Sequence, residues 1–218
     1  MQSTSVTRVL VWSRWLRISH WMIAFSTLGL LVSGLLMRHQ LYNSTIAHEI
    51  HYILTAILLP ALLARLYLLF FGKGTDHLSD CEPDAHRLSQ AWQVMKFYLT
   101  LGKAPLPKWY SHNPLWGPLY LIFFFFLALN VISGLALLNE IQLIHRLSMG
   151  DLHIFTYYVI AIFTLLHLIA VFTHDIGGTG SDISGMINGH RIFELKQEPH
   201  EQGTQTVGLE DLLRTLKK

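Results

Sequence analysis

The sequence predicts an all-α integral membrane protein, a bundle of four transmembrane helices with the N- and C-termini in the cytoplasm. Hydrophobic residues make up 51% of the 218 residues and charged residues only 14%, below the quarter that is usual in soluble domains. Four apolar stretches are each long enough to cross a bilayer core, which needs about 20 helical residues. Lysine and arginine are concentrated in alternate connecting segments, as in multi-pass membrane proteins.

The four predicted spans cover about residues 18–38, 48–71, 116–138 and 150–173. Backbone groups in lipid must be hydrogen-bonded within the chain, so each span is expected to be a helix. The first stretch is long enough to span and lacks a small-residue cleavage site, so it is interpreted as a span rather than a signal peptide. The transmembrane domain is therefore expected to cover residues 1–176, and residues 177–218 to form a cytoplasmic tail.

Basic residues predict the orientation of the bundle. The two short loops between spans contain only Arg38 and Arg146, whereas the N-terminal segment, the 72–115 loop and the tail contain nearly all the others. Loops rich in lysine and arginine stay in the cytoplasm. Both termini and the 72–115 loop are thus predicted to be cytoplasmic, and the two short loops to lie outside.

Histidine is plentiful, with thirteen residues, and several lie inside predicted spans, where an ionisable side chain is costly and is a functional candidate. His20 lies in the inner half of the first span and His167 in the inner half of the fourth. His153 precedes His167 by fourteen residues, nearly four helical turns and about 21 Å, so their rings face almost the same way. His48 and His51 lie near the outer end of the second span.

Depth in the membrane pairs these residues on two levels. His20 and His167 share the inner level, and His153 shares the outer level with His51 or His48. Neutral imidazole is a common axial ligand of haem iron. The two facing pairs therefore predict a cytochrome b that binds two haems without covalent attachment, with these histidines as the iron ligands.

Two other kinds of site are considered. The single cysteine, Cys81, and the absence of a C-x-x-C-H sequence exclude covalently attached haem. Zinc is the weaker metal alternative, because HEIH (48–51) lacks the spacing of a zinc protease and no cysteine or carboxylate cluster completes a tetrahedral site. An alternative from another class is a haem-free proton channel or transporter in which the histidines relay protons.

The second span leaves the choice of ligand open, because His48 and His51 are three residues apart and nearly share a helix face. His51 precedes Arg65 by fourteen residues, the interval between the two histidines of the fourth span, which favours His51 with His48 as the alternative. Arg65 and Arg17 are candidates to pair with haem propionates near the inner level. The alternative for Arg65 is that its guanidinium extends to the lipid headgroups.

A short internal repeat joins the two halves of the chain. LLVSGLLM (30–37) is similar to NVISGLAL (130–137), and each precedes a span with a histidine near its outer start. Gene duplication and chance explain the similarity equally well. Ser33-Gly34 and Ser133-Gly134 are small residues that allow close approach, and we interpret them as serving helix packing, with room for a flat macrocycle as the alternative.

Five segments together resemble the b-type cytochrome subunits of membrane-bound nickel–iron hydrogenases, in a family shared with the cytochrome subunits of formate dehydrogenases and thiosulfate reductases. In chain order they are RISHWMIAFSTLGLLVSG (17–34), IHYILTAILLPALLARLYLLFFG (50–72), KFYLTLGKAPLPKWYSHNPLWGPLYL (96–121), THDI (173–176) and SGMINGHRIF (184–193). The resemblance ends near residue 193. The last stretch, TVGLEDLLRTLKK (206–218), is expected to be either a short amphipathic helix or disordered.

The resemblance implies an electron-transfer subunit with two haems b in the bacterial inner membrane. In this family, electrons pass from a periplasmic iron–sulfur small subunit, itself bound to the large subunit of a hydrogenase, through the outer and then the inner haem to a membrane quinone. Nothing in this sequence could activate hydrogen, so the chain is not expected to be the hydrogen-activating subunit. It has no expected nucleic-acid partner. The cytochrome subunit of a formate dehydrogenase or thiosulfate reductase is the alternative within the same family.

The resemblance also implies specific residues. The hydrogenase type places its ligand fourteen residues before an Arg-x-Tyr, which favours His51, whereas the longer interval of the formate dehydrogenase type favours His48. Asn113 matches an asparagine at the quinone site of the formate dehydrogenase relatives, and His112 is a candidate proton donor beside it. The alternative for Asn113 is a turn or cap residue before Pro114.

Overall fold

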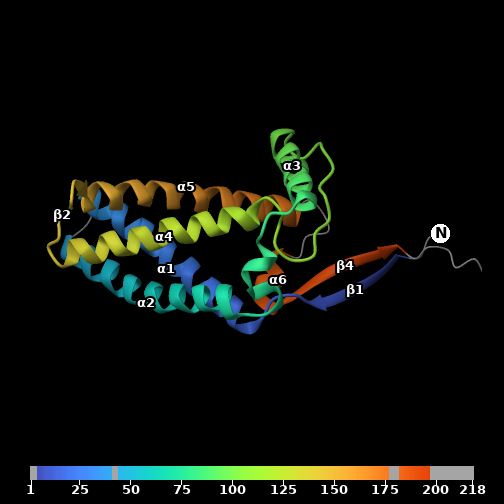
Figure 1. The fold of residues 1–218 in the computed structure, drawn as a ribbon, viewed down its shortest axis with the longest axis horizontal. Helices are drawn as coiled ribbons and strands as arrows, with labels where there is room; N and C mark the ends of the chain where they lie inside the picture. The colour runs from blue at the N-terminus through green and yellow to red at the C-terminus, as the bar shows by residue number, and fades with distance from the viewer. Residues whose placement is uncertain (1–3, 41–43, 177–181, 197–218) are drawn as a thin grey trace, which may run out of the picture.

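The computed structural model describes residues 4–40, 44–176 and 182–196, and four long helices dominate it (Figure 1). These helices are α1 (Arg14–Arg38), α2 (Ser44–Phe71), α4 (Trp116–Leu138) and α5 (Met149–Ile176). All four are long and apolar enough to cross a membrane, so the predicted four-helix membrane bundle is confirmed. α1 and α2 begin earlier than the predicted spans, because helical turns at the water interface carry polar residues that hydropathy does not count.

Shorter elements lie at the two ends of the bundle. They are β1 (Thr4–Leu10), η1 (Gly74–Asp76), η2 (Leu78–Asp80), α3 (Ala85–Leu99), β2 (Leu143–Ile144), β3 (Leu147–Ser148), α6 (Asp182–Asn188) and β4 (His190–Lys196). β2 and β3 form a small hairpin at one end. The other elements lie at the opposite end (Figure 1).

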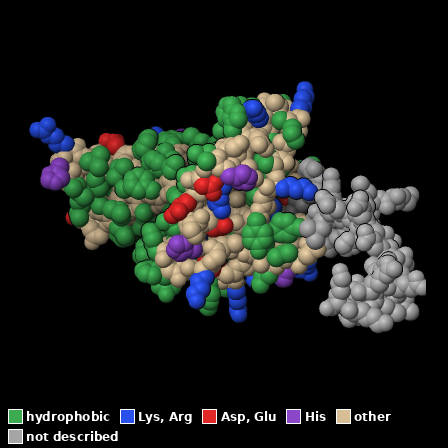
Figure 2. Space-filling view, turned by 45° about the vertical axis from the view of Figure 1, so that its right-hand side comes forward, with side chains coloured by type: hydrophobic (Ala, Val, Ile, Leu, Met, Phe, Trp, Pro, Cys, Tyr) green, Lys and Arg blue, Asp and Glu red, His purple; other side chains and the backbone are tan. Residues whose placement is uncertain are grey.

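The helices pack as two pairs of sequence neighbours, α1 with α2 and α4 with α5. Between them lies an apolar core of residues whose positions in the chain fall between the two predicted histidine levels: Ile23, Leu58, Ala61, Leu62, Leu127, Val131 and Ile160. Large apolar side chains also cover the outside of the bundle (Figure 2), among them Phe25, Ile53, Phe125 and Ile162. Such exposure is what a surface covered by lipid requires.

The end of the bundle that carries β1 and β4 has more structure than the sequence predicts. β1 and β4 form a two-stranded antiparallel sheet in which Leu10 pairs with His190 and Thr4 with Lys196. Residues 182–196, which the sequence places in a tail, thus fold back onto the start of the chain. The remaining residues of that tail, 177–181 and 197–218 with the predicted amphipathic stretch, lie outside the described residues.

Charge distinguishes the two ends. Lys, Arg, Asp and Glu side chains gather toward the end that carries β1 and β4, while hydrophobic side chains cover the bundle (Figure 2). This end also holds the 72–115 loop, and the positive-inside rule places it in the cytoplasm. The β2–β3 hairpin then marks the outer end.

Candidate functional site

At the inner level, His20 on α1 faces His167 on α5. Their ring centres are 6.4 Å apart and the ring planes are inclined at 64°. An imidazole nitrogen binds a metal at about 2.0 Å and lies about 1.2 Å from its own ring centre, so two imidazoles on opposite sides of one metal atom have ring centres about 6.4 Å apart. The two rings therefore have the separation that one shared metal atom requires.

At the outer level, His51 on α2 faces His153 on α5 with the same separation, 6.4 Å, and an angle of 66°. His48 is exposed, and its ring lies 6.4 Å from that of Tyr52. The structure thus brings together the two pairs that depth predicts. At the position where the sequence left two possibilities, it places His51 opposite His153.

Hydrogen bonds fix the two outer rings. Nδ1 of His51 lies 2.9 Å from Oγ of Ser33, and Nδ1 of His153 lies 3.0 Å from the carbonyl of Asn130 and 3.2 Å from Oγ of Ser133. A partner at Nδ1 orients a metal-binding imidazole and leaves Nε2 as the free nitrogen. Both outer rings are therefore held with Nε2 available.

The Ser-Gly repeat serves the outer site as well as helix packing. Ser33 and Ser133 stand at matching places in the repeat, and each hydrogen-bonds the outer histidine of the following helix. A Cβ atom at Gly134 would lie 3.0 Å from Cε1 of His153, which is tighter than ordinary contact. The glycine therefore makes room for the ring, a role that the packing interpretation did not include.

Each histidine pair borders a cavity. The outer cavity, about 260 Å³, is lined by His51 and His153 together with apolar side chains such as Leu58. The inner cavity, about 330 Å³, is lined by His20 and His167 and extends to the cytoplasmic loops. Mostly apolar cavities of this order, with few polar groups, are typical of cofactor sites.

The two arginines predicted to contact propionates differ in position. Arg65 is buried, lines the inner cavity and donates a hydrogen bond to the carbonyl of Asp76 at 3.1 Å. A buried guanidinium beside the inner pair fits the predicted anionic partner. Arg17 is outside the cavity lining and donates to the carbonyl of Ile187 at 2.5 Å, so in this structure it attaches α6 to α1.

Asn113 and His112 are buried and line the inner cavity. Oδ1 of Asn113 accepts a hydrogen bond from the backbone N–H of Leu115 at 2.9 Å, the turn geometry that was the alternative interpretation. Nδ2 of the same side chain is buried and, within the described part of the chain, has no hydrogen-bond partner. Burying an unpaired N–H is costly, and an acceptor oxygen on a molecule in the cavity would satisfy it.

Asp80 holds His112 in place. Its Oδ2 lies 2.5 Å from Nδ1 of His112, and Oγ of Ser111 donates to the same carboxylate at 2.6 and 2.7 Å. Burial alone would raise the pKa of Asp80, but these hydrogen bonds and the nearby Arg87 hold it below 3.8. Burial lowers the pKa of His112 against the pull of Asp80, so the ring is neutral and donates its Nδ1–H to a carboxylate.

The Asp80 contacts predict an acid-dependent loss of stability. A carboxyl group whose pKa is lower in the folded than in the unfolded chain stabilises the fold above its ordinary pKa, 3.8 here, and loses this contribution as the pH falls through the folded value. We expect Asp80→Asn to destabilise the protein at pH 7 and to flatten its loss of stability between pH 4 and pH 2. Thermal unfolding in detergent across this pH range measures both effects.

The exposed Glu82 provides the matched control for Asp80. Glu82→Gln should leave the acid dependence of the wild type in place. An acid dependence of Asp80→Asn as steep as that of the wild type would show that the Asp80 carboxylate does not stabilise the folded chain.

A second hydrogen-bonded network includes Trp116, His174 and Asp182 of the cavity lining. Nε1–H of Trp116 donates to the hydroxyl of Tyr98 at 2.9 Å, and that hydroxyl lies 2.9 Å from Nε2 of His174. We assign the hydroxyl proton to this second bond, which leaves Nδ1 of His174 protonated and 3.4 Å from Oδ2 of Asp182. Oδ1 of Asp182 is 3.1 Å from Arg191. Burial alone would raise the pKa of Asp182, but His174 and Arg191 hold it below its ordinary value.

Arg191 extends this network to the loop that carries Asn113. Nη2 of Arg191 contacts Asp182, and Nη1 lies within hydrogen-bond distance of three successive backbone carbonyls, those of Trp109, Tyr110 and Ser111. β4 therefore holds the wall of the inner cavity in position.

The sequence does not predict several members of these networks: Asp80, Tyr98, Trp116, His174, Asp182 and Arg191. THDI (173–176) and SGMINGHRIF (184–193), which include His174 and Arg191, were recognised as segments without a role for their side chains. A histidine directly followed by Asp175 at the end of a span is the local signal that could have drawn attention to His174.

Within residues 4–40, 44–176 and 182–196, no group of three or more His, Cys, Asp and Glu side chains could hold a metal ion. The histidines instead meet in opposed pairs, each beside an apolar cavity in a membrane bundle. This combination defines a membrane-bound cytochrome of the b type.

Comparison with known proteins gives the family. The family described as prokaryotic cytochrome b561 matches residues 11–189, and this chain belongs to it. Membership of this family identifies the bound group as haem b. The chain is also similar to the probable Ni/Fe-hydrogenase B-type cytochrome subunit of Bradyrhizobium diazoefficiens, with 28% identity over 218 positions that cover 85% of this chain and 86% of the relative. No solved structure matches the chain.

Proposed function

We propose that this chain is the di-haem b subunit of a nickel–iron hydrogenase complex in the bacterial inner membrane, and that it passes electrons from the periplasmic face to a quinone near the cytoplasmic face. The observation that carries the proposal is the pair of equal ring separations, 6.4 Å at both levels. Each matches two imidazoles on one iron atom. His51 and His153 would hold the outer haem, and His20 and His167 the inner one.

The protein's own residues set the environment of each haem. When bound, haem supplies one-electron redox chemistry at each level. Ser33, Asn130 and Ser133 orient the outer imidazoles through Nδ1. Arg65 would neutralise a propionate of the inner haem, since it is buried beside His20 in the same cavity. The two histidines of α5 lie about 21 Å apart along the helix, so the two sites together span much of the bilayer core.

The quinone is proposed to bind at the cytoplasmic end of the inner cavity. Nδ2 of Asn113 is a buried donor there that has no partner among the described residues, and a quinone carbonyl is an acceptor of the right kind. Reduction of a quinone to a quinol consumes two electrons and two protons. His112, neutral and fixed by Asp80, can take a proton at Nε2 from the cytoplasmic side and pass it to the quinone oxygen.

We infer the protein that donates electrons to this chain from the similar Bradyrhizobium protein and from the predicted orientation of the bundle in the membrane. The Bradyrhizobium protein is described as a hydrogenase subunit, so an iron–sulfur small subunit with its large subunit is the proposed electron donor at the outer face. A formate dehydrogenase or thiosulfate reductase complex is the alternative. Membership of a cytochrome family speaks against the haem-free channel.

Haem quantitation on two neighbouring variants tests the proposal. We expect His51→Ala to lower the content from two haems b per chain to one, because it removes one side of the outer pair. His48→Ala is the matched control, since it replaces an exposed histidine one turn away. Pyridine haemochrome spectra of the purified proteins give the haem-to-protein ratio.

The two variants separate three outcomes. Loss of one haem only in His51→Ala supports the assignment. Loss only in His48→Ala would show that the outer ligand had been chosen wrongly. A wild-type protein without haem would overturn the proposed function as a whole.

A further inference from the structure

α3 presents an apolar stripe that the described part of the chain leaves uncovered. Leu88, Trp92, Met95 and Leu99 recur at intervals of four, three and four residues, which places them on one helix face. Leu88 and Trp92 are each 58% exposed and Leu99 is 72% exposed. An apolar stripe this open on a helix in water requires a partner.

The other faces of α3 have different surroundings. Val94 is fully buried, and Phe97 and Tyr98 contact the ring of His174. Ser89 and Gln93 are exposed on a third face of the helix. The helix therefore has three sectors: one against the protein, one polar, and the apolar stripe between them.

The position of α3 puts it at the membrane surface. Tyr98 hydrogen-bonds Trp116, the first residue of α4, and His174, in the last turn of α5, so α3 lies at the depth where two spans end. It runs across the long axis of the bundle and projects beside it (Figure 1). The spans cross the bilayer along that axis, so α3 runs along the bilayer surface.

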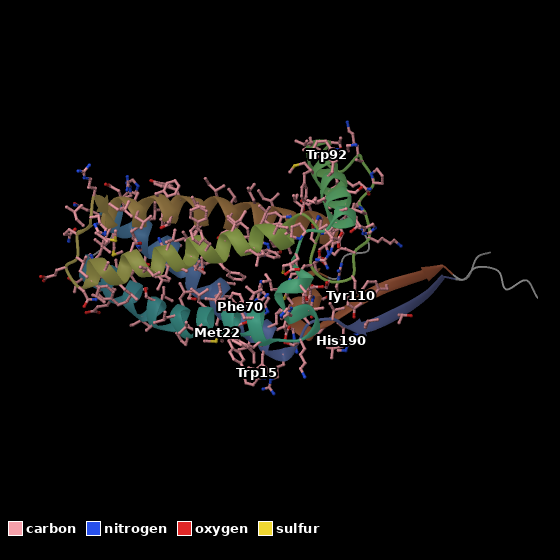
Figure 3. All side chains as sticks on the ribbon, viewed as in Figure 1. Trp15, Met22, Phe70, Trp92, Tyr110 and His190 are labelled. Carbon is pink, nitrogen blue, oxygen red and sulfur yellow. The ribbon has the colours of Figure 1, made fainter. Side chains whose placement is uncertain are left out.

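We propose that α3 lies in the cytoplasmic surface of the lipid bilayer, with Leu88, Trp92, Met95 and Leu99 in the boundary between headgroups and acyl chains. The partner is lipid, because the stripe stands at the rim of the lipid-facing surface of the bundle. Tryptophan is enriched at this depth, where one part of the ring is in apolar surroundings and the other in polar ones. Trp92 projects from α3 beside the bundle (Figure 3).

Charge next to the stripe agrees with a lipid partner. Nζ of Lys96 lies 5.6 Å from the centre of the Trp92 ring, at the border between the apolar and polar sectors. A lysine in this place can extend its ammonium group to lipid phosphates while its methylene groups cover apolar surface. α3 thus has the apolar face, flanking cation and orientation of an interfacial helix.

Spin-label accessibility tests the proposal in the full-length protein. Trp92→Cys and Gln93→Cys would each receive a nitroxide label, and the protein would be reconstituted in vesicles of phosphatidylethanolamine and phosphatidylglycerol. Burial raises the pKa of the native Cys81 thiol to about 11, so this residue should stay unlabelled, which the wild type verifies. Leu88→Cys and Ser89→Cys form a second matched pair in case replacement of Trp92 disturbs the helix.

The expected result is opposite behaviour within each pair. Labels at positions 92 and 88 should collide several-fold more with oxygen, which is concentrated in lipid, than with a water-soluble nickel chelate, and labels at 93 and 89 should show the reverse. Equal access of the nickel chelate to all four positions would overturn the proposal. If neither oxygen nor the nickel chelate reached the labels at positions 92 and 88, and their spectra showed spin–spin broadening, the lipid proposal would be overturned. The stripe would then be covered by a second copy of the chain.

Discussion

Replacing His167 with alanine is expected to halve the haem content of the purified protein and to stop electron transfer to quinone. Loss of a single hydrogen-bonding partner of a metal ligand costs about 10- to 100-fold in affinity or activity, so loss of the ligand itself should exceed that range. His20 would then face an empty position across the inner cavity. The outer pair has its own hydrogen bonds to Ser33 and Asn130 and should keep its haem.

Two measurements on His167→Ala separate binding from electron transfer. Pyridine haemochrome spectra give the number of haems, and quinone reduction in proteoliposomes with a chemically reduced donor gives the activity. His145→Ala is the control, because this histidine is exposed at the outer hairpin and should retain two haems and full activity. Retention of both haems in His167→Ala would contradict the assignment of the inner pair.

Replacing Arg191 with alanine is expected to loosen the loop that presents Asn113 by about 1.5–3 kcal/mol, the contribution of a hydrogen bond to a charged group. Asp182 would keep its half-buried charge without its guanidinium partner. The carbonyls of residues 109–111 would lose their shared donor in the same step. Hydrogen exchange of residues 109–113, followed by mass spectrometry, measures the change as faster opening of this segment.

A neighbouring arginine gives the control for Arg191. Arg8 lies on β1 of the same sheet and is exposed, so Arg8→Ala should change local stability by no more than about 0.5 kcal/mol. Haem content should stay at the wild-type value in both variants, because neither side chain contacts the four histidines. Equal exchange rates in Arg191→Ala and Arg8→Ala would show that Arg191 does not hold the loop.

The membrane helices and the histidine pairing were predictable because their signals are local. Hydropathy over twenty residues defines a span, and the place of a histidine within a span gives its depth. Depth in the membrane was enough to predict that His20 faces His167, and that His153 faces either His48 or His51. The fourteen-residue interval between His51 and Arg65 already favoured His51 over His48. The structure adds the direction of the ring, which the sequence does not give for two histidines three residues apart on one helix.

The structure of the cytoplasmic end was not predictable, because the signals that determine it are not local in the sequence. Its contacts join residues far apart in the chain, such as Arg17 with Ile187 and Tyr98 with His174. No periodic pattern encodes such partners, and a short strand such as β4 becomes stable only through pairing with β1. The role of Ser33 was missed because a small residue in a membrane helix suggests close packing before it suggests a hydrogen bond to a histidine.

The antiparallel pairing of β1 with β4 has a consequence for biosynthesis. Translation adds about 5–20 residues per second, so the ribosome reaches β4 roughly 10–40 seconds after β1. During that interval the four spans can enter the membrane while the first strand waits in the cytosol without its partner. The cytoplasmic end of the molecule is therefore its last part to form.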